Sequence, residues 1–100
     1  MGNAEHLLLS SRDERRFHVT ESHIPPGGSA GEELYTLPAD VELVYILSGS
    51  LELRVRDETH LLDEGDTLTY SPRDPHTWRN PSESEDAVVL WFAVPNPYVV

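Results

Sequence analysis

The sequence predicts an all-β fold, a small antiparallel β-barrel or jelly roll, and three observations support this. Short runs of strand-like composition alternate with turns rich in glycine, proline and aspartate along the 100-residue chain. The turns recur roughly every 8–12 residues, which is typical of β-sandwiches and barrels. No amphipathic run has the length and periodicity of a surface helix.

Composition limits both the size and the possible partners of the protein. A chain of 100 residues suits one domain, and the absence of cysteine excludes disulfides and thiolate metal sites. The net charge is −11, and all seven basic residues are arginines. Because nucleic-acid binding depends on neutralising phosphates, we expect no direct binding of nucleic acid. The chain shows neither a membrane helix nor a signal peptide, so we expect a cytoplasmic protein without a membrane partner.

The N-terminal half is predicted to contain two weakly alternating strands before the best-defined one. Residues 1–14 form an N-terminal extension or an edge strand, and the pattern of Leu7–Leu9 does not decide between a strand and a helical turn. The main domain covers 15–97, and 98–100 form a C-terminal tail. Strands are expected at 15–24 and 31–37, each ended by proline-containing turns.

The segment 41–47 is apolar on both parities, which predicts a strand covered on both faces, with Glu42 as the exception. A tight turn at Ser48-Gly49-Ser50 follows. The next run, 51–56, alternates apolar and charged residues, so it predicts a half-exposed strand that forms a hairpin with 41–47.

Short strands are expected in the second half of the chain and a long one near its end. The short strands are predicted at 59–62, 67–70 and 76–80. The continuous apolar run 87–94 predicts a central strand, which ends at Pro95.

Two segments together resemble the two motifs of the cupin superfamily. They read Glu42-x6-Gly49 and Gly65…Pro72…His76-x3-Asn80, and the resemblance covers about residues 15–95. More narrowly, 25–27, 31–35, 45–49 and 75–80 are similar to the C-terminal cupin domain of helix-turn-helix bacterial regulators. The resemblance implies a dimeric cupin barrel over 15–97 that holds a small molecule in its lumen.

The same resemblance implies a degenerate metal site. Metal-binding members carry His-x-His shortly before the glutamate of the first motif, where this chain has Thr36 and Pro38. Glu42 and His76 remain, although a firm divalent site needs three or four ligands. No cofactor is therefore expected, with Fe, Mn, Ni or Zn held by His76 and Glu42 as the alternative.

Each candidate residue has a functional and a structural interpretation. Glu42 either contacts a ligand or metal in the lumen, or lies at the rim paired to Arg79 or to water. His76 either binds a ligand or metal or is a core histidine satisfied by the backbone or by Glu42. The aromatic residues either line a pocket or fill the barrel: Tyr35, Tyr45, Trp78.

The remaining aromatic and histidine residues are given structural roles. Trp91 is expected to pack between sheets or at a dimer face. The other histidines are expected at the surface or at strand edges: His6, His18, His23 and His60.

Two functional hypotheses follow, with a purely structural dimerisation domain as a third. The first is a non-catalytic sensor domain of, or derived from, a bacterial transcription regulator. Its ligand would contact Glu42, His76, Tyr35, Tyr45 and Trp78. The second is a small cupin metalloenzyme, a dioxygenase, isomerase or lyase, with His76, Glu42 and a non-standard ligand holding the metal.

Overall fold

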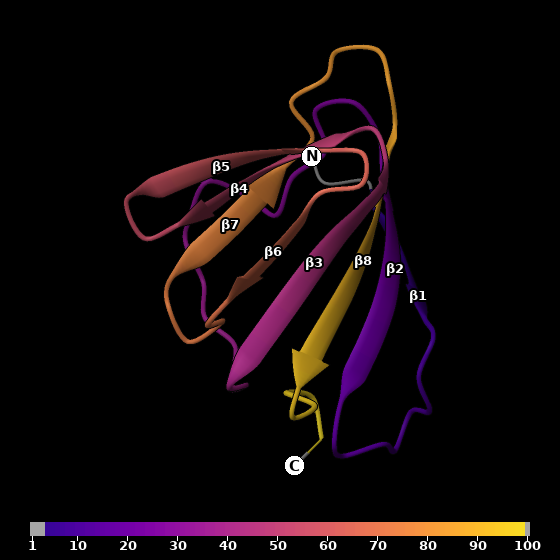
Figure 1. Cartoon of the computed structure of the whole chain (residues 1–100), viewed down its shortest axis with the longest axis vertical. Helices are drawn as coiled ribbons and strands as arrows, with labels where there is room; N and C mark the ends of the chain where they lie inside the picture. Colours follow the sequence, from indigo (N-terminus) through magenta and orange to yellow (C-terminus); the bar gives the residue numbers. More distant parts are fainter. Residues whose placement is uncertain (1–3, 100) are drawn as a thin grey trace.

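The computed structural model describes residues 4–99, in which eight strands and no helix occur (Figure 1). This confirms the all-β fold. The strands are β1 (Glu5–Leu8), β2 (His18–Ile24), β3 (Val41–Ser48), β4 (Ser50–Val55), β5 (Glu58–Asp63), β6 (Thr67–Tyr70), β7 (His76–Arg79) and β8 (Ala87–Val94). Residues 4–99 contain no helix long and apolar enough to cross a membrane.

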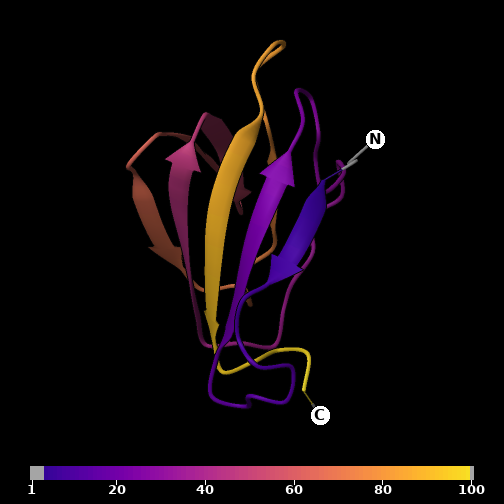
Figure 2. The ribbon, with the colours of Figure 1, turned by 90° about the vertical axis from the view of Figure 1, so that its right-hand side faces the viewer.

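The strands form two antiparallel sheets that face each other. The larger sheet has the order β1-β2-β8-β3-β6, and the smaller has the order β5-β4-β7. Figure 2 shows β8 between β2 and β3, with β1 at the edge. The prediction that the apolar run 87–94 is a central strand is therefore confirmed.

The core lies between the inward faces of the two sheets. Val44, Ile46 and Val89 from the larger sheet are fully buried, as are Leu51 and Leu53 from the smaller one. Burying side chains of this kind contributes about 1.5–3 kcal/mol each. Because successive side chains of a strand point to opposite faces, the period-2 alternation of β3 and β4 selects which residues enter this core.

The predicted hairpin between 41–47 and 51–56 is wrong. β3 pairs with β6 and β8, whereas β4 pairs with β5 and β7. The turn at Gly49, with φ 78°, carries the chain from one sheet to the other and packs against the backbone of Asp86. The hairpin in this region is β4–β5. Turn residues indicate a reversal of direction but not whether the two strands pair.

The predicted strand at 31–37 is also wrong. This segment follows the edge of β7 but joins it only by isolated bridges, Ser29 to Arg79 and Tyr35 to His76. Gly31 has φ 113°, which interrupts an extended backbone between the two bridges. The apolar spacing of 34–37 therefore reflects side chains that turn inwards from a loop.

One face of β3 is partly open, which corrects the expectation that 41–47 is covered on both faces. Its outward side chains Val41, Tyr45 and Leu47 are 37%, 36% and 38% exposed. The apolar residues of β3 and β8 that face away from the core form what we call the outer face: Val41, Leu43, Tyr45, Leu47, Val88, Leu90, Phe92, Val94.

The N-terminal segment contains an edge strand, which decides between the two alternatives for Leu7–Leu9. β1 pairs with β2 in the register His6 to Ser22 and Leu8 to Thr20. This register turns His6 and Leu8 towards the space between the sheets, although every residue of β1 keeps an exposed surface.

Candidate functional site

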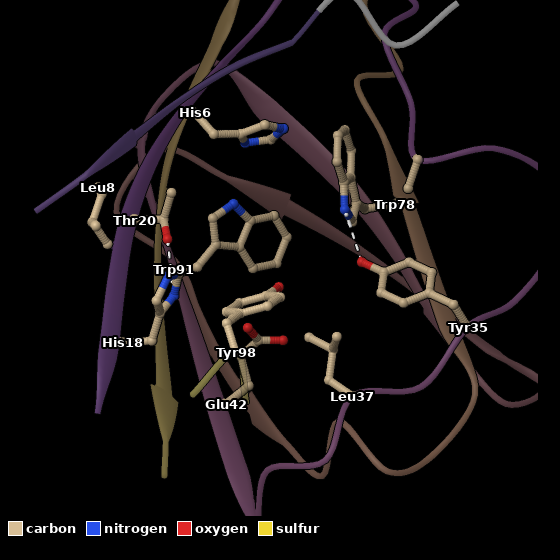
Figure 3. A pocket seen from close by; sticks show the side chains of 11 residues that line it. His6, Leu8, His18, Thr20, Tyr35, Leu37, Glu42, Trp78, Trp91 and Tyr98 are labelled. Atoms are coloured by element: carbon tan, nitrogen blue, oxygen red, sulfur yellow. Dashed lines mark hydrogen bonds between the residues drawn. The ribbon is translucent and has the colours of Figure 1, made fainter. Parts of the chain in front are cut away.

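A cavity of about 460 Å³ lies between the sheets. In Figure 3, His6 and Trp91 project from the side of the larger sheet, and Trp78 and Tyr35 project from the opposite side. Side chains from five strands, the 30–37 segment and the C-terminal tail contribute. The lining residues are His6, Leu8, His18, Thr20, Ala30, Tyr35, Leu37, Glu42, Trp78, Trp91 and Tyr98.

The two tryptophans of the chain form the centre of the aromatic lining. Their ring centroids are 6.0 Å apart and the rings are inclined by 43°. Trp78 Nε1 donates to the hydroxyl of Tyr35 at 3.2 Å, and Trp91 Nε1 donates to Ser22 Oγ at 2.9 Å. Because both indole N–H groups have partners in the protein, their positions are fixed and their ring surfaces are what a ligand would meet.

Two histidines and a C-terminal tyrosine complete the lining. The His6 ring lies 6.3 Å from the Trp78 ring, and the His18 ring lies 4.7 Å from the Tyr98 ring. Burial lowers the pKa of His18. These three residues were not predicted as site residues. The signal for His18 is its parity: it lies on the same side of β2 as the fully buried Ser22 and Ile24.

Glu42 supplies a carboxylate on the inner face of β3. It is only 6% exposed and lies opposite Tyr70 of β6, whose hydroxyl donates to Glu42 Oε1. Burial raises the pKa of Glu42, and the hydrogen bond from Tyr70 opposes this shift. The other oxygen, Oε2, has no hydrogen-bond partner among residues 4–99. The predicted alternative pairing with Arg79 does not occur, because Arg79 binds Glu52 at 2.6 Å.

Two buried tyrosines surround the carboxylate and stay protonated at neutral pH. Burial and the nearby Glu42 raise the pKa of Tyr35 to about 12. The same two causes raise the pKa of Tyr70 far above its usual value. Both hydroxyls therefore stay neutral near Glu42, where that of Tyr70 donates to the carboxylate and that of Tyr35 accepts from Trp78 Nε1.

His76 lies one layer behind the cavity wall. It is fully buried, and its ring centroid is 4.4 Å from that of Tyr35 and 5.2 Å from that of Tyr70. Its Nδ1 donates to the Asp74 carbonyl at 2.8 Å, while Nε2 has no partner in the described part of the chain. Burial lowers the pKa of His76, so the neutral imidazole is favoured.

The structure brings three of the five predicted ligand residues together. Glu42, Tyr35 and Trp78 line the cavity. His76 does not line it, although its ring packs against that of Tyr35, which does. Tyr45 points to the outer face, since it has the opposite parity to Glu42 on β3, and its predicted role as a pocket wall does not fit this geometry.

The sequence profile of the family described as cupin domain matches residues 20–93. The chain belongs to the cupin domain family. A search of curated proteins finds no significant match. Among solved structures, this cupin domain is similar to a protein from Thermus thermophilus, with a TM-score of 0.80 and 23% identity over 94% of this chain and 85% of the other.

Two further solved structures come from transcription regulators. The cupin domain of an XRE family transcriptional regulator from Enterobacter cloacae has a TM-score of 0.78 and 22% identity, over 91% of this chain and 95% of the other. An HTH_3 family transcriptional regulator from Vibrio cholerae has a TM-score of 0.77 and 15% identity, over 92% of this chain and 51% of that protein. These likenesses show the shared fold.

The residues of this cupin domain do not fit a divalent metal centre of the kind that the family implies. Within residues 4–99, no three His, Cys, Asp or Glu side chains are placed to hold an ion. The Tyr70 hydroxyl donates a hydrogen bond to one oxygen of Glu42, and the rings of Tyr35 and Tyr70 pack on the ring of His76. Thr36 and Pro38 are exposed and offer no imidazole. No chemical step is therefore derived through a metal.

Proposed function

We propose that this cupin domain is a non-catalytic sensor that binds a small molecule between its sheets. The observation that carries the proposal is the aromatic cavity of about 460 Å³ with the carboxylate of Glu42 in its wall. Small-molecule sites typically have volumes of about 300–1,000 Å³, largely apolar linings and a few placed polar groups. The cavity has these properties.

We propose further that the sensor belongs to, or derives from, a bacterial transcription regulator that acts in the cytoplasm. Support comes from the similarity to cupin domains of two regulators and from the charge. With a net charge of −11, this domain repels the phosphate backbone, so DNA contact would be made by another domain or partner. The ligand would act by favouring one geometry of the barrel or its dimer.

We propose that the domain forms a homodimer through the outer face. The outer face lies at the centre of the surface formed by β2, β8, β3 and β6. From strand length and sheet spacing, the area of this four-stranded surface is on the order of 500 Å². Specific interfaces begin at about 600 Å² per partner. A second copy of this same apolar face therefore fits as a weak, reversible partner. An acidic partner of another kind fits less well, because the outer face offers few cations for it to pair with.

Ligand binding can be tested with the two tryptophans, because both line the cavity. We expect a library of small metabolites to contain compounds that shift both indole N–H signals in NMR spectra of the ¹⁵N-labelled protein. Thr20→Phe should abolish the shifts by filling the cavity. Thr69→Phe, which places the same bulk outside on β6, should preserve them.

Two results would contradict the sensor proposal. One is a library in which no compound moves either indole signal. The other is a metal bound at one ion per chain in the purified protein and lost in His76→Ala, as measured by elemental analysis. That second result would support a metalloenzyme with Fe, Mn, Ni or Zn at His76 and Glu42.

A further inference from the structure

We infer that the ligand of this cavity is a small organic cation of the alkylammonium class, an inference that rests on the proposed ligand-binding function. Three features of the lining carry it: the sign of its charge, its supply of hydrogen-bond donors, and its aromatic surface.

The charge of the lining disfavours anions, because its basic groups are two imidazoles, His6 and His18, and burial lowers the pKa of His18. Glu42 is the one carboxylate among the lining residues, and neither Lys nor Arg lines the cavity. The chain has no lysine, and all seven arginines are exposed. An anionic ligand would therefore lie beside the carboxylate of Glu42 without a guanidinium or ammonium partner, and like charges at short range repel.

Glu42 supplies the cavity with a free hydrogen-bond acceptor. Glu42 Oε2 has no partner within residues 4–99, while Oε1 already accepts from Tyr70. Burial disfavours the ionised form of Glu42. A cation near Oε2 would favour that form, because it brings an opposite charge close to the carboxylate. The groups whose pKa values Glu42 raises are neutral phenols, those of Tyr35, Tyr70 and Tyr98.

Three hydrogen-bond donors at the cavity are already used within the protein, which leaves fewer of them for neutral ligands rich in oxygen. Both indole N–H groups are used, by Tyr35 and by Ser22. The Tyr70 hydroxyl donates to Glu42. A sugar or an acyl compound could then reach only the hydroxyl and imidazole donors that remain in the lining, such as those of Tyr35 and Tyr98, and each of its acceptors left unpaired weakens binding.

The aromatic surface matches a cation. A cation is attracted to an aromatic face when it lies within about 6 Å of the ring centroid. Because the Trp78 and Trp91 centroids are 6.0 Å apart, one cation can satisfy this distance for both rings. Tyr35 and Tyr98 add further rings to the same lining. Several rings around one carboxylate are the arrangement by which proteins recognise ammonium groups.

The test compares three probes of nearly equal shape on the whole protein. Choline is the cation, dimethylbutanol is its neutral carbon isostere, and dimethylbutyrate is a comparable anion. We expect choline to shift the two indole signals at millimolar concentration and dimethylbutanol to bind about tenfold or more weakly. Dimethylbutyrate should bind weakest. Because this ranking uses the wild type alone, it does not depend on the folding of any variant.

Two variants of matched charge locate the effect. Glu42→Gln removes the carboxylate of the cavity and keeps an oxygen that can accept from Tyr70. Glu52→Gln removes one charge from the exposed pair with Arg79 on the other sheet. We expect Glu42→Gln to weaken choline binding about tenfold or more while dimethylbutanol binding changes little, and Glu52→Gln to change neither.

The outcomes separate this inference from the proposed function. If dimethylbutanol or dimethylbutyrate binds as tightly as choline, the inference is overturned and a ligand-binding site remains. If no probe shifts the indole signals, the inference is also overturned, and the sensor proposal is decided by the wider library. If Glu52→Gln weakens choline as much as Glu42→Gln, overall charge and not the cavity carboxylate attracts the cation, which overturns the inference as well.

Discussion

Burial and hydrogen bonding shift the pKa of Glu42 in opposite directions, and the net shift makes the stability of the protein depend on pH. Burial raises its pKa in the folded state, whereas the hydrogen bond from Tyr70 lowers it. The raised folded pKa means that the native state binds more protons than the unfolded chain above pH about 4.5. Its favourable contribution is complete below that pH and is lost as the pH rises through the folded pKa.

Glu42→Gln should therefore be more stable than the wild type at pH 8, and the difference should shrink towards pH 4. The reason is that glutamine keeps the acceptor for Tyr70 without a charge to bury. Urea unfolding at a series of pH values measures this. Glu52→Gln is the control, because the exposed pair with Arg79 contributes only up to about 1 kcal/mol. If the difference in stability between Glu42→Gln and the wild type favours the variant less at pH 8 than at pH 4, the raised folded pKa of Glu42 is contradicted.

His76 should titrate in the opposite direction. Its pKa is lowered by burial in the folded state, so the unfolded chain binds more protons below its ordinary pKa of about 6.5. The stability that neutral His76 contributes is present above that pH and is lost as the pH falls towards the folded pKa. NMR titration of the imidazole should give a lower pKa in the folded protein than in urea. An equal or higher folded pKa would show that Nε2 has an acidic or hydrated partner.

At the level of elements, the turn between β3 and β4 depends on glycine for two reasons. Gly49 has φ 78°, and a Cβ there would lie 2.4 Å from the Asp86 carbonyl oxygen. Gly65 has φ 88°, but a Cβ there would meet no atom within 4 Å. Comparing substitutions at Gly49 and Gly65 therefore separates the cost of backbone strain from the cost of a steric collision.

Gly65→Ala should cost about 1–2 kcal/mol, the ordinary cost of a left-handed conformation. Gly49→Ala should cost this amount and a further 1–3 kcal/mol, roughly, because backbone atoms must move. Urea unfolding of both variants measures the difference. Equal losses would mean that the turn between the sheets can move away from Asp86 without loss of packing.

The periodicity of apolar residues was sufficient to predict the strands whose side chains alternate or are continuously apolar. It was insufficient to predict which strands pair. The apolar run 87–94 and the alternating 51–56 indicated the position and burial of β8 and β4. The same reasoning placed a strand at 31–37, because it cannot detect that Gly31 bends the chain between two bridges. It also could not show that the strands on either side of Gly49 join different sheets.

The candidate site was predicted in part for a similar reason. Glu42 interrupts an apolar strand, and Trp78 shares the parity of His76, which the resemblance to cupins directs inwards, so the direction of both side chains could be inferred. His6 and Tyr98 reach the cavity from an edge strand and the tail, where spacing carries little information, whereas His18 could have been found from its shared parity with Ser22 and Ile24 on β2. Trp91 was expected between the sheets or at a dimer face, and it lies buried between the sheets.

For the whole molecule, charge and the outer face have opposite effects on self-association. Two chains that each carry −11 repel each other, and salt screens this repulsion over about 10 Å at 0.1 M. The outer face favours association through burial of apolar side chains such as Leu90 and Phe92. We therefore expect a dimer with a dissociation constant on the order of micromolar that becomes tighter as salt increases.

Leu90→Arg should make the protein monomeric, because it places an unpaired charge opposite Tyr45 in the middle of the outer face. Leu61→Arg is the matched control, since Leu61 is 62% exposed on β5 of the other sheet. Sedimentation equilibrium at low and high salt measures the mass of each variant, and Leu61→Arg should remain dimeric. If Leu61→Arg dissociates the dimer and Leu90→Arg does not, the smaller sheet forms the interface.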